Sequence, residues 1–196
     1  MGEKQGDWLL AMRFVATNLE GAFVIELERK EDSRGFFARS FCQRELESHG
    51  LSLNVAQSNV AFTRNRGTLR GLHYQAPPAT EAKLIRCTRG SVFDVIVDLR
   101  SESPTYLKHF GLELSAENHR ALFVPALFAH GYQTLANESE VTYLVSEFYN
   151  PDYERGLRYD DPSLAISWPL PVDEISDKDK AWPLIRTDRA VALKES

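Results

Sequence analysis

The feature that most constrains the fold is a succession of short runs of β-branched and aromatic residues, which Gly, Pro, Asn and Asp interrupt. This pattern is typical of an all-β sandwich or barrel. It predicts strands at residues 22–27, 36–41, 55–62, 68–75, 82–88, 91–99, 107–114, 121–124, 131–135 and 140–149. Helix is expected only in two short segments, at 43–49 and 173–182, which disfavours a parallel sheet with crossover helices.

The length of the chain favours one domain. With 196 residues, 43% of them hydrophobic, the chain can build one sizeable core but hardly two. We expect a single domain over 13–185, between an N-terminal extension (1–12) and a C-terminal tail (186–196). So many short strands in one domain predict a double-stranded β-helix, a jelly roll of the cupin-like barrel type. The open mouth of such a barrel is a natural site for a small molecule.

Charge and apolar segments narrow the choice of partner and compartment. The net charge of −5 is spread along the chain without a basic block, so nucleic acid is not expected as a partner. The apolar stretch at 8–12 is too short to cross a bilayer and lacks the flanks of a signal peptide, so no membrane contact is expected. Cys42 and Cys87 have apolar neighbours, which favours buried, reduced thiols and a cytoplasmic protein.

Two polar segments stand out among the predicted strands. Residues 68–75 (TLRGLHYQ) place Arg70 and His73 within one strand length, and His130 stands beside Gly131 at the start of another strand. On local evidence alone, His73 is either a catalytic group or a core histidine satisfied by a carboxylate. Strict alternation would put Arg70 and His73 on opposite faces. Gly71 between them allows a bulge that turns both side chains toward one cavity.

Two histidines in a cupin-like barrel raise the question of a metal centre. The metal-binding pattern of cupins has two histidines separated by one residue and followed by a glutamate. Here Gln75 stands two residues after His73, and the next glutamate is Glu81. A metal is therefore not expected, although a metal-dependent cupin enzyme remains an alternative.

Eight segments of the chain, taken in order, resemble the dTDP-4-dehydrorhamnose 3,5-epimerase family. They are residues 33–37, 57–59, 69–75, 83–87, 92–95, 114–118, 128–131 and 176–179. The resemblance extends from about residue 14 to residue 185. It implies a homodimeric, cofactor-free barrel that inverts C3, C5 or both in a nucleoside-diphosphate 4-keto-6-deoxyhexose. The resemblance favours conversion of dTDP-4-dehydro-6-deoxyglucose to dTDP-4-dehydrorhamnose.

The resemblance also implies roles for individual residues. His73 matches the general base, Asp179 the carboxylate paired with it, and Tyr143 the acid. Lys83 and Arg70 match residues near the sugar and its keto group. Positions that contact the nucleotide, its phosphates or the sugar are matched by Arg34, Gln57, Asn59, His130, Tyr149, Glu154 and Lys178.

The chemistry of epimerisation explains why these residue types are needed. Removing a proton next to a ketone requires a base and stabilisation of the enolate oxygen, which His73 and the cations Lys83 and Arg70 supply. Inversion also requires a donor on the opposite face of the enolate, and Tyr143 is the candidate. We expect neighbouring cations to ease the departure of its proton. The alternative for Tyr143 is a strand aromatic that fills the core.

One position departs from the family pattern. Many members carry an acidic residue two places after the aromatic pair Phe36-Phe37, where this chain has Arg39. An arginine there offers a longer, cationic group toward the substrate, so the sugar configuration and the nucleotide stay open. Two further alternatives also stay open: a non-catalytic sugar-nucleotide binding module, and an epimerase that acts at one carbon only.

Overall fold

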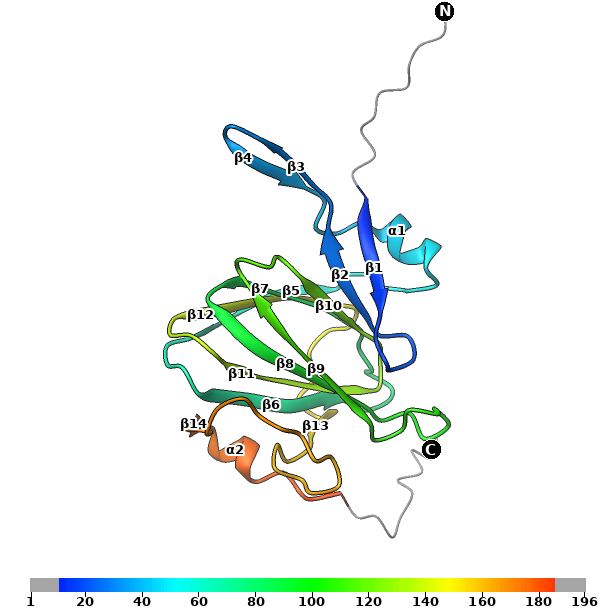
Figure 1. The fold of residues 1–196 in the computed structure, drawn as a ribbon. Helices are drawn as coiled ribbons and strands as arrows, with labels where there is room; N and C mark the ends of the chain where they lie inside the picture. The colour runs from blue at the N-terminus through cyan, green and yellow to red at the C-terminus, as the bar shows by residue number, and fades with distance from the viewer. Residues whose placement is uncertain (1–10, 186–196) are drawn as a thin grey trace, which may run out of the picture.

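The computed structural model describes residues 11–185, which fold into two facing β-sheets with a projecting hairpin (Figure 1). The first sheet contains, in order, β1 (Met12–Ala16), β2 (Phe23–Leu27), β10 (Ala121–Val124), β7 (Lys83–Arg89), β12 (Ser139–Val145) and β5 (Gln57–Thr63). The second contains β13 (Glu154–Gly156), β6 (Thr68–Gln75), β11 (Phe128–Thr134), β8 (Ser91–Asp98) and β9 (His109–Ser115). The pairs within these two orders are antiparallel, which confirms the predicted all-β jelly-roll class.

The remaining elements lie at the margins of this barrel. Strands β3 (Arg29–Asp32) and β4 (Gly35–Ala38) form a separate hairpin, which projects beyond the two sheets in Figure 1. Helix α1 (Gln43–Ser48) follows the hairpin, and the short helix α2 (Asp177–Lys180) follows β14 (Glu174–Ile175), which pairs with β6 in parallel. Within the described range, no helix has the length and apolar character needed to span a membrane.

Hydrophobic side chains from both sheets meet in the barrel interior and form its main core. The first sheet contributes residues such as Ile85 and Leu122, and the second contributes Ile96, Leu114 and Phe128, each at most 2% exposed. Burying each of these side chains stabilises the fold by about 1.5–3 kcal/mol relative to leaving it in water. This core fills only part of the space between the sheets and leaves the rest for polar groups.

The outer faces of the sheets are covered too, which corrects one expectation. Alternation along 91–99 predicts a half-buried strand, but nearly the whole of β8 is buried. Val92 and Ile96 face the main core, whereas Val95 and Val97 pack on the other face against the C-terminal segment, including Leu164. That segment is remote in sequence, so local alternation cannot reveal the second buried face.

Several predicted boundaries differ from the observed ones, for physical reasons. The all-charged strand β3 and the very short β13 and β14 carry no hydrophobic pattern, and none of them was predicted. The short helix expected within 173–182 is α2, and the unpredicted strand β14 precedes it. Met12, assigned to the extension, is the buried first residue of β1. The remainder of the predicted extension, except residue 11, and all of the predicted tail lie outside the described residues.

Candidate active site

A β-bulge brings Arg70 and His73 to the same side of β6. His130 pairs with His73 and Tyr132 pairs with Arg70, so two residues of β6, Gly71 and Leu72, oppose the single residue Gly131 of β11. Gly71 has a φ of +119°, and a Cβ there would lie 2.5 Å from the Cα of Gly131. Only glycine combines this backbone conformation with so close an approach. The predicted bulge at Gly71 is confirmed.

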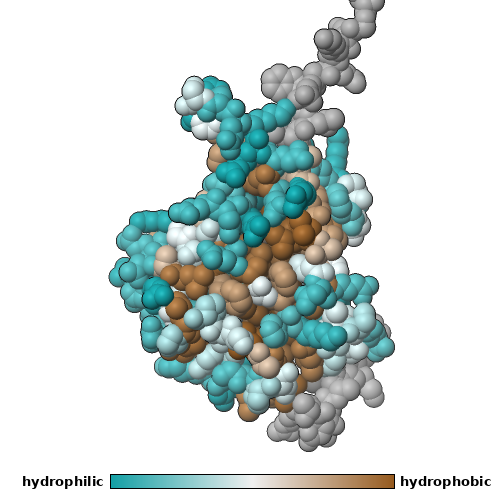
Figure 2. Space-filling view, in the orientation of Figure 1, coloured by the Kyte–Doolittle hydropathy of each residue, from teal (hydrophilic) through white to brown (hydrophobic). Residues whose placement is uncertain are grey.

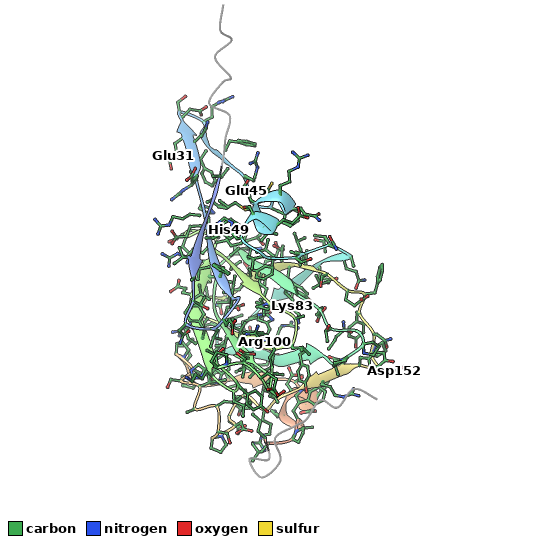
Figure 3. All side chains as sticks on the ribbon, turned by 90° about the vertical axis from the view of Figure 1, so that its right-hand side faces the viewer. Glu31, Glu45, His49, Lys83, Arg100 and Asp152 are labelled. Carbon is green, nitrogen blue, oxygen red and sulfur yellow. The ribbon has the colours of Figure 1, made fainter. Side chains whose placement is uncertain are left out.

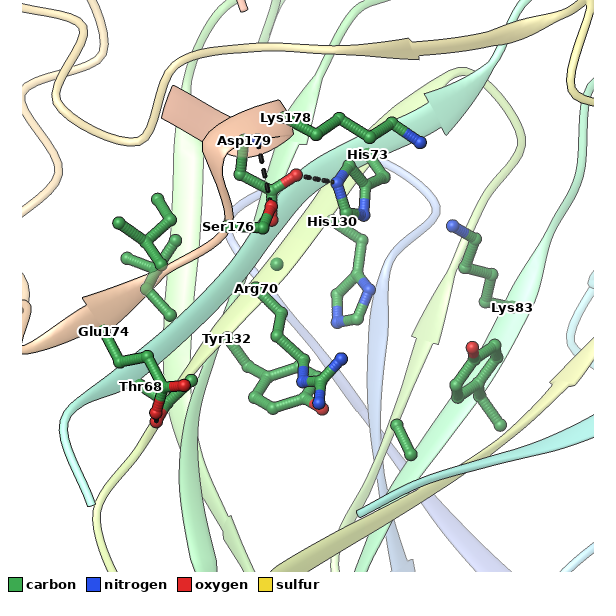
Figure 4. A pocket seen from close by; sticks show the side chains of 15 residues that line it. Thr68, Arg70, His73, Lys83, His130, Tyr132, Glu174, Ser176, Lys178 and Asp179 are labelled. Atoms are coloured by element: carbon green, nitrogen blue, oxygen red, sulfur yellow. Dashed lines mark hydrogen bonds and ion pairs between the residues drawn. The ribbon is translucent and has the colours of Figure 1, made fainter. Parts of the chain in front are cut away.

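Both side chains line a hollow of about 490 Å³ between the two sheets, which we name the inner hollow (Figure 4). Its walls include Lys83 and Tyr143 from the first sheet, Arg70, His73, His130 and Tyr132 from the second, and Ser176, Lys178 and Asp179 around α2. Figure 3 shows Lys83 pointing into the barrel interior, far from Glu31 on the hairpin. The sheets therefore bring together residues that are widely spaced in the sequence.

His73 forms a short contact with Asp179, with 2.6 Å between Nε2 and Oδ1. The backbone N–H of Gly71 donates to the other carboxylate oxygen, and the Ser176 hydroxyl caps α2 by accepting from the Asp179 N–H. Burial raises the pKa of Asp179, but the hydrogen bond and charge of His73 outweigh it and hold that pKa below its usual range. When His73 donates from Nε2, its Nδ1 is left as the basic nitrogen.

His130 forms a second histidine–carboxylate pair in the same hollow. Its Nε2 lies 2.9 Å from Oδ2 of Asp94, a fully buried residue of the neighbouring strand β8. His130 stands within β11, which begins at Phe128, before the predicted strand 131–135. Residues 11–185 contain no group of three or more His, Cys, Asp or Glu side chains arranged to hold a metal ion.

Lys83 and Tyr143 face the two histidines from the first sheet. Lys83 Nζ pairs with Oε1 of Glu81 at 3.0 Å, and the Lys83 side chain is only 9% exposed. Burial and the charge of Glu81 raise the pKa of Tyr143, while Arg70 acts in the opposite direction. Arg70 therefore acts on the Tyr143 proton as expected, but burial and Glu81, which was not foreseen, outweigh it. Tyr143 also packs against the main core.

A second hollow of about 380 Å³, which we name the outer hollow, adjoins the first. The two hollows share His73, Lys83 and Tyr143, and the outer one is also lined by Gln57, Asn59, Glu81, Tyr149 and Glu154. Glu154 accepts from the Tyr149 hydroxyl at 2.7 Å and pairs with Lys178 at 2.6 Å. These bonds offset the effect of burial and lower the pKa of Glu154. The geometry provides one continuous cleft with reactive groups where the hollows meet.

Two predicted substrate contacts lie away from both hollows. Arg34 stands in the hairpin turn, with its side chain 86% exposed and paired to Asp32. Arg39 pairs with Glu45 of α1 at 2.7 Å. A single copy of the chain therefore does not bring the hairpin to the cleft, whereas the other predicted site residues all line it.

The hollow-lining or supporting groups that were not predicted include Glu81, Asp94, Tyr132 and Glu174. Two of them could have been recognised from the sequence. Asp94 is an acid among buried β-branched residues, and such a group needs a partner on a neighbouring strand. Glu81 continues the alternation of Lys83 and Ile85, which places it toward the barrel interior.

Comparison with known proteins agrees with this geometry. Residues 16–187 match the family model described as dTDP-4-dehydrorhamnose 3,5-epimerase. A protein of that name from Methanothermobacter thermautotrophicus is 44% identical over 177 residues, which cover 89% of this chain and 95% of the relative.

Solved structures of 3,5-epimerases resemble the fold of this chain. The dTDP-4-dehydrorhamnose 3,5-epimerase of Bacillus anthracis, with TDP and PPi bound, has a TM-score of 0.86 at 43% identity and covers 89% of this chain and 100% of its own. The dTDP-6-deoxy-D-glucose-3,5-epimerase of Legionella pneumophila, in complex with dTDP-4-keto-L-rhamnose, has a TM-score of 0.83 at 38% identity, covering 89% and 93%. Because sequence, fold and cleft agree, the chain belongs to the dTDP-4-dehydrorhamnose 3,5-epimerase family and is an epimerase.

Proposed function

We propose that this chain inverts C3 and C5 of dTDP-4-dehydro-6-deoxyglucose, giving dTDP-4-dehydrorhamnose. The observation that carries the proposal is one cleft with a histidine–carboxylate pair, His73 with Asp179, on one sheet side and Tyr143 with Lys83 on the other. The ligands named for the two solved relatives, TDP and dTDP-4-keto-L-rhamnose, support the choice of substrate.

His73 removes the proton from the carbon next to the keto group. Asp179 holds the imidazole in the tautomer that donates from Nε2 and stabilises the imidazolium that forms, as a carboxylate does in a catalytic triad. The electrons of the broken C–H bond move to the keto oxygen and give an enolate. Lys83 stabilises that oxygen, assisted by Arg70, in a cleft where charges act more strongly than in bulk water.

Tyr143 completes the inversion by donating its hydroxyl proton to the opposite face of the enolate carbon. Its raised pKa keeps the hydroxyl protonated at neutral pH until that step. One turnover leaves His73 protonated and Tyr143 ionised, so a proton must pass from the imidazolium to the tyrosinate, by way of solvent, to reset the site. The same cycle at the second carbon gives the double inversion.

The outer hollow accommodates the nucleoside diphosphate. Gln57 and Asn59 stand on its β5 wall, and Tyr149 offers an exposed ring. Lys83, which lines both hollows, and Lys178 and Arg70 of the adjoining inner hollow supply the positive charge that a diphosphate needs on a protein with a net charge of −5. The amide groups of Gln57 and Asn59 suit the hydrogen-bonding groups of a base or sugar.

An assay in deuterium oxide tests this function directly. With dTDP-4-dehydro-6-deoxyglucose as substrate, we expect proton NMR to record loss of the C3 and C5 signals and appearance of the inverted product. GDP- and CDP-linked 4-keto sugars serve as matched controls for the nucleotide. Exchange at C3 alone would mean a 3-epimerase. Binding without any exchange would mean a binding module, and loss of activity in chelator would mean a metal-dependent enzyme.

We further propose a homodimer in which the β3–β4 hairpin of one subunit reaches the cleft of the other. Phe36 and Phe37 are 43% and 70% exposed on the projecting hairpin, and Val60 and Phe62 are exposed on the edge strand β5. Exposed apolar side chains at a sheet edge favour pairing with another chain. Figure 2 shows hydrophobic residues gathered across the middle of the barrel face below the hairpin. A second copy would also give Arg34 and Arg39 a route to a substrate.

Light scattering at micromolar concentration is expected to give the mass of two chains. Phe37→Ser should weaken the association, because it removes an exposed aromatic side chain from the proposed contact. Leu184→Ser removes an apolar side chain outside the hairpin, 45% exposed against 70% for Phe37, and should leave the mass unchanged. A monomeric mass for the unaltered protein would contradict the dimer.

We also propose a cytoplasmic location. Cys42 and Cys87, the two cysteines of the chain, are both free thiols. Burial raises the pKa of Cys87 to about 11, so this thiol is suited to a core position rather than to redox chemistry. Free thiols are the usual state in a reducing compartment.

A further inference from the structure

Glu81 occupies a place in the cleft that none of the predicted roles uses. It lies two residues before Lys83 on the approach to β7, and Lys83 and Ile85 continue the same inward-facing alternation. Its side chain lines the outer hollow, and its Oε1 lies 3.0 Å from Lys83 Nζ. The Lys83 and Glu81 side chains are 9% and 13% exposed, so this is a nearly buried ion pair rather than a surface one.

The register of the first sheet brings this pair close to Tyr143. Lys83 is the partner of Val145, and Ile85 is the partner of Tyr143, so Lys83 and Tyr143 are diagonal neighbours on one face of the sheet. Side chains in that relation are near enough for a long side chain to reach across. Lys83, Glu81 and Tyr143 all line the outer hollow.

The other carboxylates of the cleft are engaged elsewhere. Asp179 pairs with His73, Asp94 with His130, and Glu154 with Lys178. Glu174 accepts from the Asn65 amide and the Thr68 hydroxyl. Arg70 donates to the Thr63 hydroxyl and to a backbone carbonyl. The titratable groups that line the two hollows with Tyr143 are Glu81, Lys83, Arg70, His73, Tyr74, His130, Tyr132, Tyr149, Glu154, Glu174, Lys178 and Asp179.

We propose that Glu81 is a positioning residue of this active site, whose carboxylate anchors the Lys83 ammonium beside Tyr143 and balances the positive charge around the Tyr143 hydroxyl. Only the effect of Glu81 on catalysis rests on the proposed function. Its contact with Lys83 does not. The physical need is clear, because two cations close to a tyrosine favour its ionised form, and an ionised tyrosine has no proton to donate. The pKa of Tyr143 is in fact raised, with Glu81 second only to burial among the causes.

The first test is a titration of Tyr143 that needs no substrate. Tyrosinate absorbance is recorded against pH for the Glu81→Gln protein and, as a blank, for the same protein carrying Tyr143→Phe, so that the difference reports Tyr143 among the seven tyrosines. We expect the midpoint for Tyr143 to lie at lower pH than in the unaltered protein, because the effect of Arg70 is then no longer opposed by Glu81, and because the Lys83 ammonium loses the anion that balances its charge.

Three comparison variants make the titration specific. Glu117→Gln removes an exposed carboxylate outside both hollows and should leave the midpoint unchanged. Glu81→Asp keeps the charge, so its midpoint should stay closer to that of the unaltered protein than the midpoint of Glu81→Gln. Adding Lys83→Gln to Glu81→Gln should move the midpoint back up. A midpoint in Glu81→Gln that is equal to or above that of the unaltered protein would overturn the proposal.

The second test is the pH profile of the epimerase reaction. If Tyr143 must be protonated, the rate in Glu81→Gln should begin to fall at lower pH than in the unaltered protein, by about tenfold for each pH unit beyond the shifted midpoint. A shifted titration in a protein that never exchanges substrate protons would refute the proposed function and leave the role of Glu81 intact. Normal exchange with an unshifted titration and an unmoved alkaline limb would refute the role of Glu81 alone.

Discussion

Replacing His73 with alanine is expected to slow deuterium exchange at the carbon next to the keto group by about a hundredfold to ten-thousandfold, the usual loss for a general base. The His73 imidazole is oriented by a nearly buried carboxylate, through the 2.6 Å contact with Asp179. Nucleotide binding should be largely retained, because the outer hollow keeps Gln57, Asn59 and Tyr149. Exchange is measured by proton NMR, and binding by calorimetry with dTDP.

Two further variants distinguish loss of the general base from loss of the fold. His73→Gln keeps a side-chain amide that can donate to Asp179, yet it cannot accept the substrate proton, so it should be as slow as the alanine variant. His109→Ala changes a histidine on β9, outside both hollows, and should retain normal exchange. Exchange near the normal rate in both His73 variants would remove His73 from the mechanism.

How far the sequence predicts this site depends on the range over which each signal acts. The convergence of Arg70 and His73 could be foreseen, because Gly71 marks a bulge within the strand itself. The opposition of His73 and Tyr143 rested on the family resemblance. No local pattern reveals that β6 and β12 belong to facing sheets.

The incorrect expectations share one physical cause: a partner that is remote in sequence determines the burial of a strand or the charges around a side chain. β8 is buried on both faces because residues near Leu164 return to cover it. The environment of Tyr143 was misjudged because Glu81 was not considered as a charge inside the barrel. Arg34 matches a substrate-binding position of the family, but in a single copy of the chain its side chain pairs with Asp32 and lies outside both hollows.

Replacing Tyr143 with phenylalanine is expected to separate proton exchange from inversion. The change removes one hydroxyl and keeps the ring that packs against the main core, so the fold should persist. Enolate formation relies on His73 with Lys83 and Arg70, so substrate protons should still be lost to solvent deuterium. Inversion requires a donor on the far face of the enolate, so epimerised product should nearly disappear.

The measured quantity is the ratio of exchange to inversion at each carbon, followed by proton NMR in deuterium oxide. Slow delivery of a proton by water from the far face can leave a trace of product, so neither rate alone decides the question. The ratio should rise sharply in Tyr143→Phe and stay unchanged in Tyr106→Phe, a tyrosine outside both hollows. Because burial and Glu81 keep Tyr143 protonated, the difference in this ratio between the two variants should be largest near neutral pH, where the Tyr143 hydroxyl is fully protonated. An unchanged ratio with inversion at the normal rate would assign the acid to another residue or to water, and would leave Tyr143 as a core aromatic.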